Sequence, residues 1–132
     1  TDAPGNRQGL RVVSPLVNPG HTVTIAPADR HVVVRVDGEV IAETDHPVVL
    51  EETGMVTRYY LPREDVRMDL LRATNFTTQC PFKGEASYYD LGGRHDFVWY
   101  YPDPIPAVEA IRDRLAFYND RVLVLVDGEP EE

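Results

Sequence analysis

Alternation of apolar and polar residues runs along most of the chain and predicts β-strands. Short runs rich in valine, isoleucine and tyrosine recur between turn residues, a pattern typical of half-buried strands. Only residues 106–115 have helical spacing, with Val108, Ile111 and Leu115 on one face. The pattern predicts a mostly β fold (α+β minor) with one short helix in the C-terminal half. The predicted strands span residues 21–25, 31–36, 39–43, 48–50, 56–61, 85–91, 96–101 and 122–126.

One predicted hairpin recurs near the end of the chain. Asp37-Gly38 separates two β-branched runs, and an Asp-Gly pair suits the type I′ turn, which needs positive φ at both central residues. Residues 32–39 reappear almost unchanged as residues 122–129. This similarity has two interpretations, an internal duplication or two hairpins of independent origin.

The composition predicts a single domain with short extensions. Residues 1–20 are rich in proline and glycine and lack periodicity, so we expect a flexible N-terminal arm. Residues 21–128 form the predicted β-rich domain, and residues 129–132 an acidic tail. A chain of 132 residues is long enough for one hydrophobic core.

Charge and cysteine content exclude several function classes. The net charge of −9 argues against a nucleic-acid partner, because phosphates need a basic surface. No apolar run approaches the ~20 residues of a membrane span, and no secretory signal opens the chain. We therefore expect an acidic cytoplasmic protein with no membrane partner, and the preference for arginine over lysine suggests a bacterial source. One cysteine and four unpaired histidines predict neither metal nor cofactor.

The first candidate for chemistry is the segment 77–84, expected to be a loop, which contains the only cysteine and the only lysine of the chain. A thiolate is the nucleophilic form of Cys80, and a nearby ammonium from Lys83 favours it. Lys83 could also act as a Schiff-base amine or an anion clamp. The alternative is structural: Cys80 as a small buried side chain and Lys83 as the cap of a surface loop.

Two further groups are candidates for ligand binding. Arg63 and Asp65 follow Pro62 at a predicted helix start, where they could position an anionic group or simply form a capping ion pair. All aromatic residues lie between residues 59 and 118, and tyrosine doublets place one ring on each face of a strand. The inward rings could line a pocket or serve only as core. The candidates are Tyr60, Tyr88, Trp99 and Tyr100.

Four ordered blocks of sequence carry a family resemblance. Residues 60–66, 78–88, 98–102 and 115–118 resemble the bacterial and fungal family called domain of unknown function 427, also catalogued as nucleotidyltransferase-like. The resemblance extends from about residue 23 to residue 128 and implies a compact β-tent (Mss4-like) fold. Zinc binding, which paired cysteines provide in several β-tent families, does not carry over to a chain with one cysteine. Nucleotidyltransferases usually have a Gly-Ser signature and paired carboxylates, which this sequence lacks.

Together these features lead to two hypotheses. In the first, the protein is a cytosolic small-molecule-binding domain, with the question of catalysis open, whose ligand is anionic or aromatic. Cys80 and Lys83 are then the candidate catalytic residues, and the candidate ligand-binding residues are Tyr60, Arg63, Asp65, Tyr88, Trp99 and Tyr100. In the second, the protein is a non-catalytic scaffold or a homodimer, and its motif residues only fix the fold.

Overall fold

The chain folds into antiparallel sheets joined by short turns. A computed structural model describes residues 10–13, 21–119 and 121–131. The strands in these ranges are β1 (Leu10–Val13), β2 (Thr22–Pro27), β3 (Val32–Val36), β4 (Glu39–Thr44), β5 (Val48–Glu52), β6 (Arg58–Tyr60), β7 (Leu71–Cys80), β8 (Gly84–Leu91), β9 (Arg94–Tyr100), β10 (Ala116–Phe117), β11 (Leu123–Val126) and β12 (Glu129–Pro130). The helices are 3-10 helices: η1 (Arg63–Asp65), η2 (Met68–Leu70) and η3 (Pro106–Ile111).

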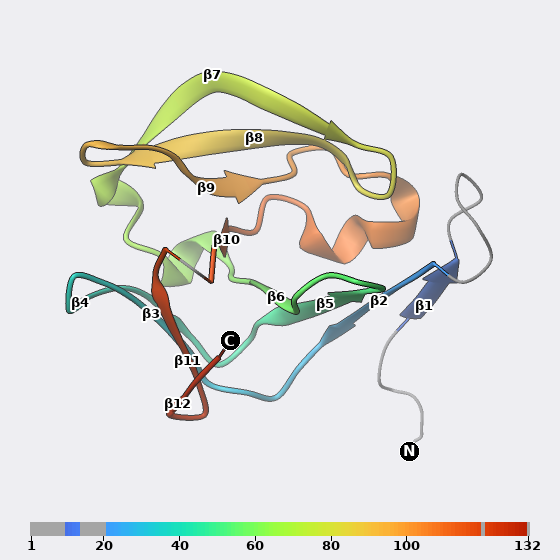
Figure 1. The fold of residues 1–132 in the computed structure, drawn as a ribbon, viewed down its shortest axis with the longest axis horizontal. Helices are drawn as coiled ribbons and strands as arrows, with labels where there is room; N and C mark the ends of the chain where they lie inside the picture. Colours follow the sequence, from blue (N-terminus) through green and yellow to red (C-terminus); the bar gives the residue numbers. More distant parts are fainter. Residues whose placement is uncertain (1–9, 14–20, 120, 132) are drawn as a thin grey trace.

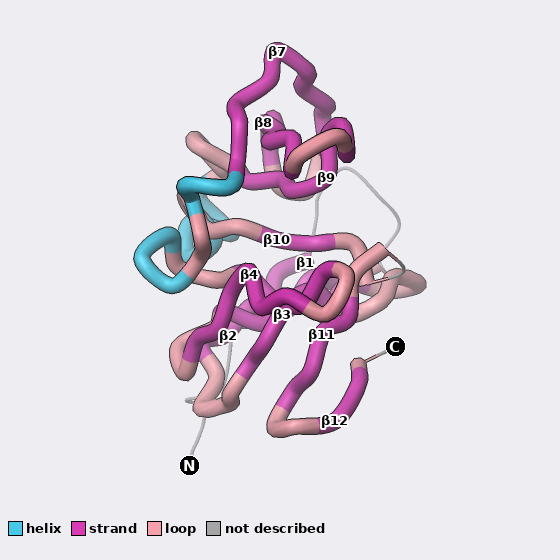
Figure 2. The backbone as a smooth tube through the Cα atoms, turned by 90° about the vertical axis from the view of Figure 1, so that its left-hand side faces the viewer, coloured by secondary structure: helices cyan, strands magenta, loops and turns pink. Residues whose placement is uncertain are grey.

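The strands make three four-stranded sheets, which confirms the predicted mostly β fold class. Their orders are β1-β2-β5-β6, β12-β11-β3-β4 and β10-β9-β8-β7. In Figure 1 the long strands β7, β8 and β9 extend across the top of the view, and the other two sheets lie below them. Figure 2 shows β10 between these upper strands and the lower sheets. No helix among the described residues is long and apolar enough to cross a bilayer.

The repeated hairpins lie side by side in one sheet. Asp37 and Gly38 have φ values of 52° and 82°, and Asp127 and Gly128 have 52° and 85°, as the predicted Asp-Gly turns require. Strands β3 and β11 pair so that Val34 lies opposite Val124, its counterpart in the repeat. The two hairpins are therefore related by a local two-fold arrangement around this pair.

The strand β7 was not predicted from the sequence. It is the edge strand of its sheet, with β8 as its one neighbour among the described strands, and most of its side chains are exposed on both faces. An edge strand of this kind needs no apolar alternation, so the sequence carries no strand signal there. The predicted loop 77–84 is consequently shorter than expected: residues 77–80 belong to β7, and only residues 81–83 form a turn.

Three other expectations need correction. Leu10–Val13 pairs with β2 within the arm that was predicted to be flexible, and the rest of that arm lies outside the described residues. The predicted helix is shorter and of the 3-10 type, and it is interrupted at Val108, where φ and ψ are −122° and 32°. Glu129–Pro130 pairs with β11 and is not a free tail.

The core has two clusters of buried side chains. One lies against β3, β4 and β11, and the other lies between the sheet of β2 and β5 and the sheet of β8 and β9. Leu61 follows β6 and Leu115 precedes β10, and the two residues exchange paired backbone hydrogen bonds of 2.8 and 2.9 Å. The second cluster contains most of the aromatic residues that the sequence identified as candidates: Tyr60, Tyr88 and Trp99.

His31 predicts a pH dependence of stability. Its Nδ1 atom lies 2.6 Å from Asp45 Oδ1, and its Nε2 atom lies 2.7 Å from Glu43 Oε2. The hydrogen bond to Asp45, assisted by Glu43, raises the pKa of His31 above its usual value. The resulting stabilisation is complete below the unfolded-state pKa of about 6.5 and is lost as the pH rises through the higher folded-state pKa.

Denaturant unfolding over a pH series should therefore show a loss of stability in that window. His31→Gln and Asp45→Asn should each reduce this loss, since each removes the main hydrogen bond. An unchanged pH profile in His31→Gln would show that another group is responsible.

Candidate functional site

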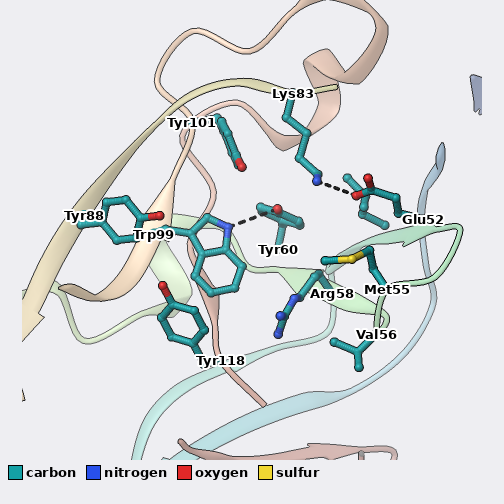
Figure 3. Close-up of a pocket in the computed structure, with 11 residues that line it drawn as sticks. Glu52, Met55, Val56, Arg58, Tyr60, Lys83, Tyr88, Trp99, Tyr101 and Tyr118 are labelled. Atoms are coloured by element: carbon teal, nitrogen blue, oxygen red, sulfur yellow. Dashed lines mark hydrogen bonds and ion pairs between the residues drawn. The ribbon is translucent and has the colours of Figure 1, made fainter. Parts of the chain in front are cut away.

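A pocket of about 180 Å³ lies between the sheet of β5 and β6 and the sheet of β8 and β9 (Figure 3). Five of its eleven lining residues are aromatic, and its charged groups come from β5, β6 and the turn after β7. The residues that line it are Leu50, Glu52, Met55, Val56, Arg58, Tyr60, Lys83, Tyr88, Trp99, Tyr101 and Tyr118.

The two-residue period of the strands decides which aromatic rings face this pocket. Trp99 and Tyr101 line it, whereas the intervening Tyr100 packs against the other core cluster. Tyr60 lines the pocket as well, and its neighbour Tyr59 belongs to the other cluster. Each doublet therefore contributes one ring to the pocket wall, as alternation along a strand requires.

The turn between β7 and β8 places Lys83 at one end of the pocket. The Lys83 amide donates to the Cys80 carbonyl at 3.2 Å, and the Ile105 amide donates to the Lys83 carbonyl at 2.8 Å. The side chain is only 11% exposed, and its Nζ atom lies 2.7 Å from Oε1 of Glu52, which is 7% exposed. The same Nζ atom lies 3.8 Å from Cys80 Sγ. The only thiol and the only lysine of the chain are therefore in contact.

Glu52 extends this contact into a chain of polar groups. Its second oxygen, Oε2, lies 3.0 Å from His21 Nε2, and the His21 ring stacks on Phe82 with ring centroids 4.3 Å apart. A buried ion pair is costly to desolvate and adds little to stability relative to apolar residues of similar volume. Charged groups enclosed beside an apolar cavity make this end of the pocket a candidate for ligand binding.

The aromatic wall is held by hydrogen bonds and ring contacts. Trp99 Nε1 donates to the Tyr60 hydroxyl at 3.3 Å, and the Trp99 ring centroid lies 4.6 Å from that of Tyr118. The Tyr88 hydroxyl is 2.9 Å from Thr78 Oγ1. Burial raises the pKa of both Tyr60 and Tyr101, so these hydroxyls stay protonated at physiological pH.

Four of the sequence candidates do not line the pocket. Cys80 lies beside the lining residue Lys83 but is not itself part of the wall, and Arg63, Asp65 and Tyr100 lie elsewhere. Arg63 Nη1 donates to the Tyr89 hydroxyl at 2.8 Å, and its guanidinium lies 4.7 Å from the Tyr100 ring centroid. Asp65 accepts a 2.7 Å hydrogen bond from Thr44. The structure therefore places Arg63, Asp65 and Tyr100 outside the pocket that contains Lys83, Tyr60, Tyr88 and Trp99.

Several residues of the pocket were not identified from the sequence. Arg58 precedes Tyr60 by two residues, and Tyr101 follows Trp99 by two, so strand alternation could have indicated both. Glu52 pairs with a lysine 31 positions away. No local sequence signal could have predicted that contact.

Gly84 gives a direct test of the turn that carries Lys83. Its φ of +122° is unfavourable for other residues, and a Cβ atom there would lie 3.3 Å from the Asp103 carbonyl oxygen. Gly84→Ala should lower the free energy of unfolding by about 1–3 kcal/mol. Gly93→Ala is the matched control, because it has open space for a Cβ atom and no positive φ. Equal denaturation midpoints for the two variants would contradict this reading of the turn.

Among the described residues, no group of three or more His, Cys, Asp and Glu side chains is arranged to hold a metal ion.

None of the curated proteins compared with the chain matches it. One family profile, described as "Domain of unknown function (DUF427)", matches residues 24–128. This match confirms the resemblance seen in the four sequence blocks and covers all of the pocket residues. The chain therefore belongs to the DUF427 family.

Proposed function

We propose that this domain binds a small molecule in the pocket between the two sheets, beside the turn 80–84. The observation that supports this most is the buried ion pair of Lys83 and Glu52 at one end of an aromatic cavity. Pockets that bind small ligands combine apolar walls with a few polar groups that fix orientation. The volume of about 180 Å³ is below that of pockets for drug-sized ligands and suits a ligand of about one ring.

The proposal includes a chemical role for Cys80. Lys83 Nζ donates to Cys80 Sγ across 3.8 Å, and the thiolate form of a cysteine is the nucleophile. Lys83 would stabilise the thiolate, and Glu52 would hold Lys83 in place through the 2.7 Å contact. Cys80 is not one of the lining residues, so the proposal places this reactive thiol beside the Lys83 end of the pocket and not in its wall.

The reactivity of Cys80 should depend on Lys83. Iodoacetamide should alkylate native Cys80 at neutral pH, and Lys83→Met should slow the reaction by about three- to tenfold. Because the chain has one cysteine, the bulk rate reports this site alone. A Cys80 that reacts only after denaturant is added would contradict the chemical role and leave the binding proposal intact.

Ligand binding can be tested through Trp99, the only tryptophan of the chain and part of the pocket wall. A collection of single-ring compounds of different charge should include some that change its fluorescence and saturate. Tyr118→Leu should weaken binding, because Tyr118 lines the pocket and contacts Trp99. Tyr100→Leu is the matched control, since Tyr100 adjoins Trp99 in sequence but does not line the pocket. Equal effects of the two substitutions would argue against binding there.

The edge strand β7 supports a second candidate function, homodimer formation. Its ten residues carry one charged side chain, Arg72, and Phe76 is 48% exposed. A long edge strand with little charge can pair with a second copy of itself. Sedimentation velocity should then show a dimer that Phe76→Lys weakens. A monomer at high concentration would contradict this candidate.

A further inference from the structure

The pocket contains a cation, Arg58, that no carboxylate of the described residues neutralises. Arg58 is half-buried, and none of the described acidic side chains forms an ion pair with it. Its Nη1 atom donates to the neutral Asn119 Oδ1 at 3.3 Å, and the guanidinium carbon lies 5.1 Å from the Trp99 ring centroid. An arginine has five N–H donors, so most of its hydrogen-bonding capacity is not used by this contact.

The charges around the pocket leave it locally positive. Only Glu52, Arg58 and Lys83 among its lining residues are charged, and Lys83 pairs with Glu52. The second oxygen of Glu52 is occupied by His21. Arg58 therefore gives the lining residues one net positive charge, within a chain whose net charge is −9. Such a site attracts an anion that the rest of the protein surface repels.

The surrounding groups fit an aromatic anion in particular. Figure 3 shows the Tyr88, Trp99 and Tyr118 rings on one side, and Arg58 with Met55 and Val56 on the other. The aromatic ring of a ligand packs favourably against aromatic side chains such as these. The Tyr60 hydroxyl accepts from Trp99, so its own proton remains available to a ligand oxygen.

We propose that the ligand is a single-ring aromatic carboxylate, whose ring packs against Trp99 and whose carboxylate binds Arg58. This inference rests on the proposed function and specifies its ligand class. A guanidinium binds a carboxylate through two parallel hydrogen bonds, a geometry that lysine cannot provide. The aromatic wall excludes water and strengthens this ion pair.

Three compounds of matched shape test the inference: benzoate, benzamide and benzylamine. Titration calorimetry at constant ionic strength should show benzoate binding roughly tenfold more tightly than benzamide, with benzylamine the weakest. Arg58→Met should abolish the preference for benzoate, and Arg58→Lys should retain only part of it. Arg121→Met is the matched control, because Arg121 lies over the Tyr118 ring, 4.3 Å from its centroid, without lining the pocket.

The outcomes separate this inference from the proposed function. In one contrary result, benzoate and benzamide bind equally well, and a folded Arg58→Lys protein binds both as the natural sequence does. That result would overturn the assignment of an anionic ligand and leave a pocket that binds small molecules. If Arg121→Met also abolishes the preference for benzoate over benzamide, the assignment of the carboxylate to Arg58 is overturned. If none of the three compounds binds the natural sequence, both the inference and the proposed function fail.

Discussion

Lys83→Met should lower the free energy of unfolding by about 3–5 kcal/mol. The substitution leaves the Glu52 carboxylate, which is 7% exposed, without its closest cation. Methionine fills a similar volume, so the loss reflects the unpaired charge and not a cavity. Guanidinium denaturation, followed by circular dichroism, measures the change.

A double substitution separates the charge effect from packing. Lys83→Met combined with Glu52→Leu should recover most of the loss, because apolar replacement of a buried pair is often neutral. Arg67→Met is the exposed control: Arg67 pairs with Asp69 at 3.0 Å, and its removal should cost far less stability than the loss of Lys83, because solvent screens the exposed pair. A double variant as unstable as the sum of its single variants would contradict the account of the pair.

Leu115→Ala should lower the free energy of unfolding by about 2–5 kcal/mol. Leu115 is 0% exposed, and it is joined to Leu61 by two backbone hydrogen bonds where β6 approaches β10. Truncation leaves a cavity that the surrounding sheets cannot close fully. Thermal and denaturant unfolding, analysed together, measure the effect.

The exposed Leu123 provides the matched control. It is 44% exposed on β11, so Leu123→Ala should cost less than about 1 kcal/mol. Leu115 does not line the pocket, so ligand affinity of folded Leu115→Ala should equal that of the natural sequence. Equal stability losses for Leu115→Ala and Leu123→Ala would contradict the structural role assigned to Leu115.

Local patterns allowed much of the fold to be predicted from the sequence. The Asp-Gly turns and the valine-rich strands beside them depend on neighbouring residues alone, and they are present where predicted. The strand β7 was missed because its side chains are exposed on both faces and so show no apolar alternation. The helix over 106–115 was predicted too long, because its apolar spacing also suits a short 3-10 segment interrupted at Val108.

The candidate site was predicted only in part, because several of its contacts join residues that are distant in the sequence. Lys83 and Cys80 are three residues apart, and a tight turn brings them into contact. Arg63 is close to Tyr60 in sequence, but the chain turns after β6 and carries it to Tyr89 and Tyr100. Glu52 and Arg58 are in the pocket because two sheets pack together. Such contacts depend on the tertiary fold and not on any local motif.

The indole N–H signal of Trp99 in a ¹H–¹⁵N correlation spectrum tests the central claim most directly. This group lies in the pocket wall and donates to Tyr60, and the chain has no other tryptophan. We expect at least one of benzoate, benzamide and benzylamine to shift this signal until it saturates, and Tyr118→Leu to weaken the response. A signal that none of the three moves, up to the limit of their solubility, would contradict ligand binding in this pocket.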